Sequence, residues 1–135
     1  MKTIKISDIQ VKFGGTNEPK DQKIIDLFKD AYSGKLLVTV AMIKIEGIKP
    51  FSDFKPKISE GFRSHFEDLE KQDTPPQLHV YPKDGVFIMS DDYNAFYLYL
   101  EKNYSKVICL VLGEAEGEFV LEKSEPFQMP APTSS

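Results

Sequence analysis

The sequence predicts a single α+β domain in which a mixed β-sheet of about five to six strands is accompanied by three helices. Its 135 residues are a common length for one domain, and 41% hydrophobic with 28% charged residues is the balance of a packed globular protein. Segments with the periodicity of strands alternate with three segments of helical periodicity. We expect the domain to span 1–123, followed by a flexible C-terminal tail over 124–135.

The first part of the chain predicts a strand followed by a helix. Apolar and polar residues alternate over 3–13, as in a half-buried strand, until two glycines at 14–15 interrupt the pattern. Asn17 and Pro19 are start signals for a helix, which we expect Gly34 to end in a left-handed conformation. The apolar positions at helical spacing are Ile24, Ile25, Phe28, Ala31 and Tyr32.

The middle of the chain predicts a buried strand, a loop and a second helix. Residues 36–45 are almost continuously apolar and β-branched, which indicates a strand covered on both faces and favours a central place in the sheet. Prolines and phenylalanines among lysines predict an ordered loop over 47–57. An apolar stripe opposite a charged face then predicts a helix over 59–71.

The last part predicts a hairpin, a third helix and two further strands. The hairpin turn is Pro82-Lys83-Asp84-Gly85, in which proline presets φ and glycine takes the positive φ. Ser90-Asp91-Asp92 opens the helix, and Asn103 is expected just past its end. The expected strands are 77–81, 85–89, 106–112 and 118–121.

Charge and hydropathy limit the classes of function. The formal net charge of −4 repels phosphate backbones, and Arg63 is the only arginine, so binding to DNA or RNA is not expected. The start of the chain has no apolar signal region, and no apolar run approaches the roughly 20 residues of a membrane span. We therefore expect a cytoplasmic protein that does not associate with membranes.

Catalytic and metal-binding patterns are not found in the sequence. Cys109 lies in an apolar run and is interpreted as a buried small side chain. The two histidines, His65 and His79, lack the local spacing of zinc ligands, and no serine stands in a G-x-S-x-G turn. We expect no catalytic residue, no metal ligand and no cofactor.

Two adjacent carboxylates are the nearest approach to a catalytic pair. Asp91 and Asp92, after Ser90, could share a proton or hold a divalent cation. They could instead cap the helix that follows, where acidic groups face the positive end of the helix dipole. A second candidate is the glycine turn over 13–16, which either binds an anion through its backbone or only links a strand to a helix.

A lysine-rich loop with two phenylalanines is the only concentration of positive charge with aromatic rings for stacking. It is either a ligand site, completed by the helix start near residue 90, or a solvated loop held by its apolar side chains. The candidate ligand-binding residues are Lys49, Phe51, Phe54, Lys55, Lys57, Arg63, Ser90, Asp91, Asp92 and Tyr93.

The order of elements over 75–113 resembles the ParB/sulfiredoxin-like domain. A proline-flanked strand is followed by a short hairpin, a turn at 90–95, a helix and the strand at 107–113, and residues 4–9 match the family's opening strand more loosely. The resemblance implies a ParB-like α+β fold in which the turn grips phosphate groups. At that turn this sequence has Ser90-Asp91-Asp92-Tyr93-Asn94 and lacks the family's arginine and cysteine motif residues. The family's nuclease, CTPase and sulfinic-acid reductase activities are therefore not carried over.

Three hypotheses of function follow. The first is a non-enzymatic binding or interaction protein, an inhibitor or accessory factor, that engages a protein partner or itself as a dimer. Its expected signature is exposure of Phe51, Phe54, Tyr93, Tyr97 or Tyr99. The second is a nucleotide or small-ligand binding protein that uses the lysine-rich loop and the helix start. The third is a divalent-metal-dependent hydrolase centred on Asp91 and Asp92.

Overall fold

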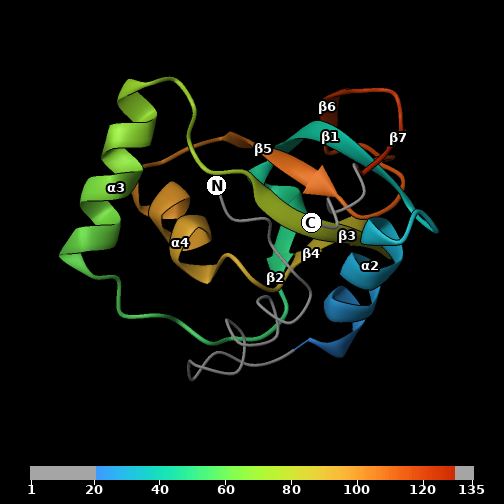
Figure 1. Ribbon diagram of the computed structural model, residues 1–135. Coiled ribbons are helices and arrows are strands. Elements are labelled where there is room, and N and C mark those ends of the chain that lie inside the picture. The colour runs from blue at the N-terminus through green and yellow to red at the C-terminus, as the bar shows by residue number, and fades with distance from the viewer. Residues whose placement is uncertain (1–20, 130–135) are drawn as a thin grey trace, which may run out of the picture.

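The computed structural model describes residues 21–129, so the strand expected over 3–13 and the glycine turn over 13–16 lie outside the described residues. The elements are, in chain order, α2 (Gln22–Tyr32), β1 (Leu37–Lys44), the 3-10 turn η1 (Ile45–Gly47), β2 (Ile48–Pro50), α3 (Glu60–Lys71), β3 (Leu78–Lys83), β4 (Val86–Met89), α4 (Tyr93–Glu101), β5 (Lys106–Val111), β6 (Val120–Lys123) and β7 (Phe127–Gln128) (Figure 1).

The strands form one mixed sheet in the order β2-β4-β3-β5-β1-β6, and β7 also pairs with β1. The pairs β2–β4 and β3–β5 are parallel, whereas the pairs β3–β4, β1–β5, β1–β6 and β1–β7 are antiparallel. With three helices and a mixed sheet in one domain, the predicted α+β class is confirmed.

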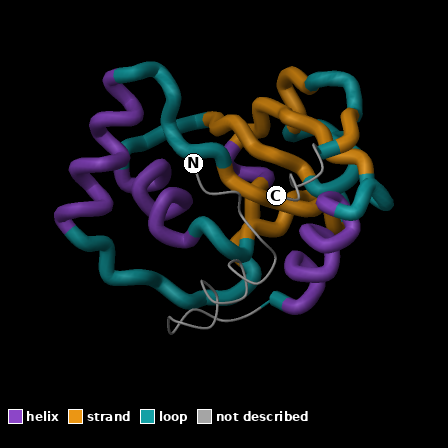
Figure 2. Tube along the Cα trace, viewed as in Figure 1, coloured by secondary structure: helices purple, strands orange, loops and turns teal. Residues whose placement is uncertain are grey.

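Helices cover the two sides of the sheet separately (Figure 2). On one side, α3 and α4 pack on a core that includes Phe66, Tyr99, Cys109 and Val111. On the other side, α2 packs through Ile24 and Phe28 on Val38, Tyr81, Leu110 and Leu112. Alternate residues of each strand serve the two cores, because successive side chains of a strand point to opposite faces.

The strand β1 is buried along one face and, on the other, only at Val38, so the predicted cover of both faces is partial, and the strand is not central. Val38 belongs to the core under α2, and Ala41 and Ile43 belong to the core under α4. The centre of the sheet is instead β3 and β5, and β1 lies between β5 and the short strands β6 and β7. A continuous apolar run predicts that both faces of a strand are covered. It does not predict which strands pair with it or where it lies in the sheet.

The hairpin β3–β4 is confirmed, with a different turn from the expected one. Pro82 pairs with Phe87 inside the ladder, so the turn consists of Asp84 and Gly85 alone. Both have positive φ, 51° and 84°, which is the type I′ geometry that suits the twist of two-residue hairpins. The Asp-Gly dipeptide, and not the proline, is therefore the local determinant of this turn.

Two short strands were not expected from the sequence. Within the segment predicted as a loop, Ile48–Pro50 pairs with β4 as β2. Within the segment predicted as a tail, Phe127–Gln128 pairs with Leu37 and Val38 as β7. Strands this short have almost no periodicity of their own, and they exist because a longer strand supplies their partner.

Candidate functional site

The turn between β4 and α4 is tied to the neighbouring strand. Asp92 occupies the N-cap position of α4, but its side chain makes no capping hydrogen bond. Its Oδ2 instead accepts from the main-chain N–H of His79 at 2.8 Å and lies 3.1 Å from the imidazole Nδ1. For Asp92, the capping interpretation is therefore wrong, because the carboxylate points across to β3.

Ser90 and Tyr93 do not face solvent. Ser90 is 1% exposed, and its buried Oγ has no hydrogen-bond partner in the described part of the chain. Tyr93 is fully buried, with its hydroxyl 3.0 Å from Ser52 Oγ and its ring edge-on to Phe54 at 5.4 Å. These contacts hold the loop after β2 against the start of α4.

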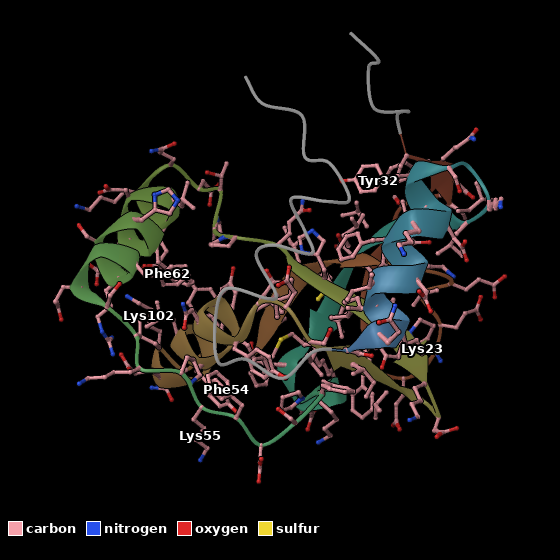
Figure 3. The ribbon with its side chains drawn as sticks, turned by 60° about the horizontal axis from the view of Figure 1, so that its bottom comes forward. Lys23, Tyr32, Phe54, Lys55, Phe62 and Lys102 are labelled. Atoms are coloured by element: carbon pink, nitrogen blue, oxygen red, sulfur yellow. The ribbon has the colours of Figure 1, made fainter. Side chains whose placement is uncertain are left out.

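The candidate residues of the lysine-rich loop do not converge on one point. Arg63 forms a two-point ion pair with Glu101, at 2.5 and 3.1 Å, and the hydrogen bond from Arg63 lowers the pKa of Glu101. Lys49, Lys55 and Lys57 are exposed, and Lys55 points away from the body of the protein (Figure 3). The single arginine is thus engaged by a carboxylate of its own chain.

The expected aromatic surface is mostly buried. Of its five members, only Phe51 is exposed, at 41%, whereas Phe54 and Tyr97 are half-buried. Tyr93 and Tyr99 are core residues, and both belong to the cluster that α4 buries against the sheet. Aromatic content by itself did not distinguish the core from the surface.

The described residues hold no group of three or more His, Cys, Asp or Glu side chains that could bind a metal ion. His65 is exposed on α3, and Cys109 is buried, where desolvation raises the pKa of its thiol. A search of the same residues finds no helix of the length and apolar character needed to cross a membrane.

A groove of about 610 Å³ lies beside the first half of β5, within the size range of ligand-binding clefts. Two of its walls are the segment that leads from α3 into β3 and the segment that leads from α4 into β5. It is lined by Met42, Asp73, Pro75, Tyr99, Lys102, Asn103, Tyr104, Ser105, Lys106, Val107 and Ile108. Sequence reasoning did not single out this region.

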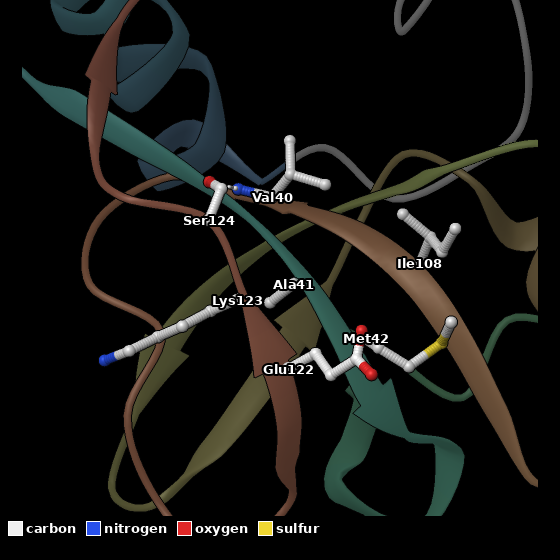
Figure 4. A pocket seen from close by; sticks show the side chains of 7 residues that line it. All are labelled: Val40, Ala41, Met42, Ile108, Glu122, Lys123 and Ser124. Atoms are coloured by element: carbon white, nitrogen blue, oxygen red, sulfur yellow. Dashed lines mark hydrogen bonds between the residues drawn. The ribbon is translucent and has the colours of Figure 1, made fainter.

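Met42 and Ile108 are the apolar centre of this surface. They face each other across the β1–β5 ladder, so their side chains lie on the same face of the sheet. Ile108 is 37% exposed, and both residues also line a second hollow of about 290 Å³ bounded by Val40 and Ser124 (Figure 4). The two hollows therefore share an apolar ridge on the sheet, formed by these two side chains.

Polar contacts hold the groove's helical wall in place. The hydroxyl of Tyr99 donates to the carbonyl oxygen of Pro76, and the hydroxyl of Tyr104 donates to Glu70 at 2.5 Å. The bond to Glu70, with a smaller contribution from burial, raises the pKa of Tyr104 to about 12. Lys102 lies 3.2 Å from Glu70, which leaves this lysine neutralised at the rim.

The chain has no similar protein in the three comparisons made. No family model matches it, and no curated protein or solved structure matches it significantly.

Proposed function

We propose that this protein is a non-enzymatic binding domain that engages a segment of a partner protein in the groove beside β5. The observation that carries the proposal is the pair of half-buried Met42 and exposed Ile108, which gives the groove an apolar centre beside the part of β5 that β3 does not pair. Exposed apolar surface in a concave site is the common property of protein-interaction sites.

The turn between β4 and α4 supports a binding role over the activities of the ParB/sulfiredoxin-like family, in which the corresponding turn binds phosphate. The elements β3, β4, α4 and β5 follow the order that the resemblance implies, and we propose a degenerate ParB-like scaffold. At its turn, the Asp92 carboxylate is used by His79 and Ser90 is buried. Neither residue is presented to an incoming nucleotide.

A phage-displayed library of random dodecapeptides, selected on the full chain, tests the proposal. Peptides selected at the groove are expected to lose about tenfold or more in affinity with Ile108→Glu, since a charge would lie at the apolar centre. Leu37→Glu is the matched control, because Leu37 is an exposed strand residue, at 53%, that does not line the groove. A selection that yields only peptides indifferent to Ile108→Glu would refute the function.

A further inference from the structure

The backbone direction of β5 follows from two hydrogen bonds. Leu112 N donates to Val80 O at 2.8 Å, and Ile45 N donates to Ser105 O at 3.0 Å. Main-chain groups of a strand alternate between its two sides. The even-numbered residues of β5 thus direct their N–H and C=O groups toward β3, and the odd-numbered ones direct theirs toward β1.

The β3 side of β5 is only half paired. The ladder with β3 begins at Leu78 opposite Cys109, although β5 itself begins three residues earlier, at Lys106. The N–H of Ile108 and both main-chain groups of Lys106 therefore face the groove, and no described residue pairs its backbone with them.

Two prolines explain why β3 does not extend along the groove. Pro76, in the same phase as Leu78 and Val80, would direct its main-chain groups toward β5 but has no N–H to donate to a ladder, and Pro75 has none to donate on the β4 side. The carbonyl oxygen of Pro76 is already used by the hydroxyl of Tyr99. The opening in the sheet is thus encoded by the local sequence and fixed by a contact from α4.

We propose that the groove binds an extended acidic peptide segment by strand addition, as an extra strand beside Lys106–Ile108. This inference rests on the proposed function and adds the mode of peptide binding and the chemistry of the peptide. Unpaired strand edges beside a hydrophobic groove are the structural basis of such recognition, in which main-chain bonds supply affinity and alternate side chains supply specificity.

The positive charge of Lys106, on the β5 side of the groove, is the reason that we expect an acidic side chain on the bound peptide. Lys106 is exposed and forms no ion pair within the described residues, in contrast to Lys102. Lys106 and Ile108 are two residues apart in one strand, so their side chains lie on the same face. The complementary segment carries an apolar and an acidic side chain at positions i and i+2. Asp73, on the other wall, repels a second acidic group and limits the segment to one.

The closing experiment uses the peptides selected on the full chain, synthesised with single N-methylated amides. Strand addition predicts a loss of about three- to tenfold for methylation at alternate amides only, because every second amide faces β5. In two-dimensional ¹H–¹⁵N NMR, the amides of Lys106 and Ile108 are expected to shift on binding and to become protected from exchange.

Substitutions of charge test the ligand chemistry. Lys106→Gln is expected to weaken the selected peptides about two- to fivefold, and Asp73→Asn to strengthen them. Lys83→Gln, at an exposed strand lysine outside the groove, is the control. Peptides that depend on Ile108 but show neither the alternation nor the Lys106 effect would refute strand addition and leave the proposed function intact. A selection without Ile108-dependent peptides would refute both.

Discussion

Asp92 joins the start of α4 to β3, because its carboxylate accepts the main-chain N–H of His79 at 2.8 Å and lies 3.1 Å from the imidazole of the same residue. The contact spans thirteen residues of sequence and occurs at the turn where the family resemblance implies a phosphate-binding loop. A carboxylate used in this way contributes to the fold, and its removal has a measurable consequence.

Asp92→Ala should lower the free energy of unfolding by about 1–3 kcal/mol, since the main-chain N–H of His79 loses a charged acceptor in a half-buried place. Urea denaturation followed by circular dichroism measures the change. Asp68→Ala, at an exposed position of α3, should change stability by less than about 0.5 kcal/mol. Equal effects of the two substitutions would contradict a structural role for Asp92.

Stability should depend on pH through the pair Tyr104 and Glu70. Their hydrogen bond raises the pKa of Tyr104 to about 12, so this contribution is complete below pH 10, the ordinary tyrosine value, and is lost as the pH rises toward 12. The same bond lowers the pKa of Glu70, so that contribution is present above the ordinary glutamate pKa of about 4.3 and is lost as the pH falls through the folded-state value.

Tyr104→Phe removes the hydroxyl and keeps the ring. It should cost about 1 kcal/mol at pH 7, and the difference from the unsubstituted protein should shrink toward both pH extremes. Melting temperatures measured across the pH range show the decrease of this difference at alkaline pH and at acidic pH. A stability difference that stayed constant from neutral pH to pH 12 would show that the Tyr104–Glu70 hydrogen bond does not cause the loss of stability at alkaline pH.

Two glycines should respond in opposite directions to alanine. Gly85 has φ +84° with no atom within 4 Å of an added Cβ, so Gly85→Ala should destabilise by about 1–2 kcal/mol through backbone strain alone. Gly61 lies inside α3, and its added Cβ would meet only Ser59 Oγ at 3.9 Å. Gly61→Ala should stabilise by about 0.5–1 kcal/mol. Thermal unfolding of both variants checks the opposite signs.

A thermal-shift screen distinguishes the proposed peptide-binding function from the nucleotide-binding and hydrolase hypotheses. Nucleoside mono-, di- and triphosphates and cyclic nucleotides, with Mg²⁺, Mn²⁺ or Ca²⁺, should leave the melting temperature unchanged, because Glu101 engages the Arg63 guanidinium. A ligand at about 100 times its dissociation constant would add about 2.7 kcal/mol of stability. A shift of several degrees with a nucleotide would favour the ligand-binding hypothesis, and one that required a divalent ion would favour the hydrolase.

The elements with strong local periodicity were predictable from the sequence. The apolar stripes of α2 and α3, the presence of α4, the hairpin β3–β4 and the burial of Cys109 all follow from patterns within about a dozen residues. The cap of α2 shows the limit, because Asp21 caps this helix through Lys23 N, whereas the expected start signals Asn17 and Pro19 lie outside the described residues. Asp21 is also a good N-cap residue by type, and its sequence position alone did not single it out.

The candidate site was less predictable from the sequence than these elements. Arg63 was a candidate for ligand binding, yet its partner Glu101 is 38 residues away in sequence. Tyr93 and Tyr99 were candidates for an interaction surface, yet α4 turns them into the core. The residues of the groove come from β1, the end of α3, the end of α4 and β5, and no motif connects them.

The sequence by itself determined the α+β class, the positions of the three described helices and the two prolines that prevent β3 from starting earlier. Only the tertiary structure decided that β5 lies beside β3, so that backbone groups of Lys106 and Ile108 have no backbone partner among residues 21–129. The reason is physical: helices and tight turns satisfy their hydrogen bonds locally, whereas a strand takes its partner from a distant part of the chain.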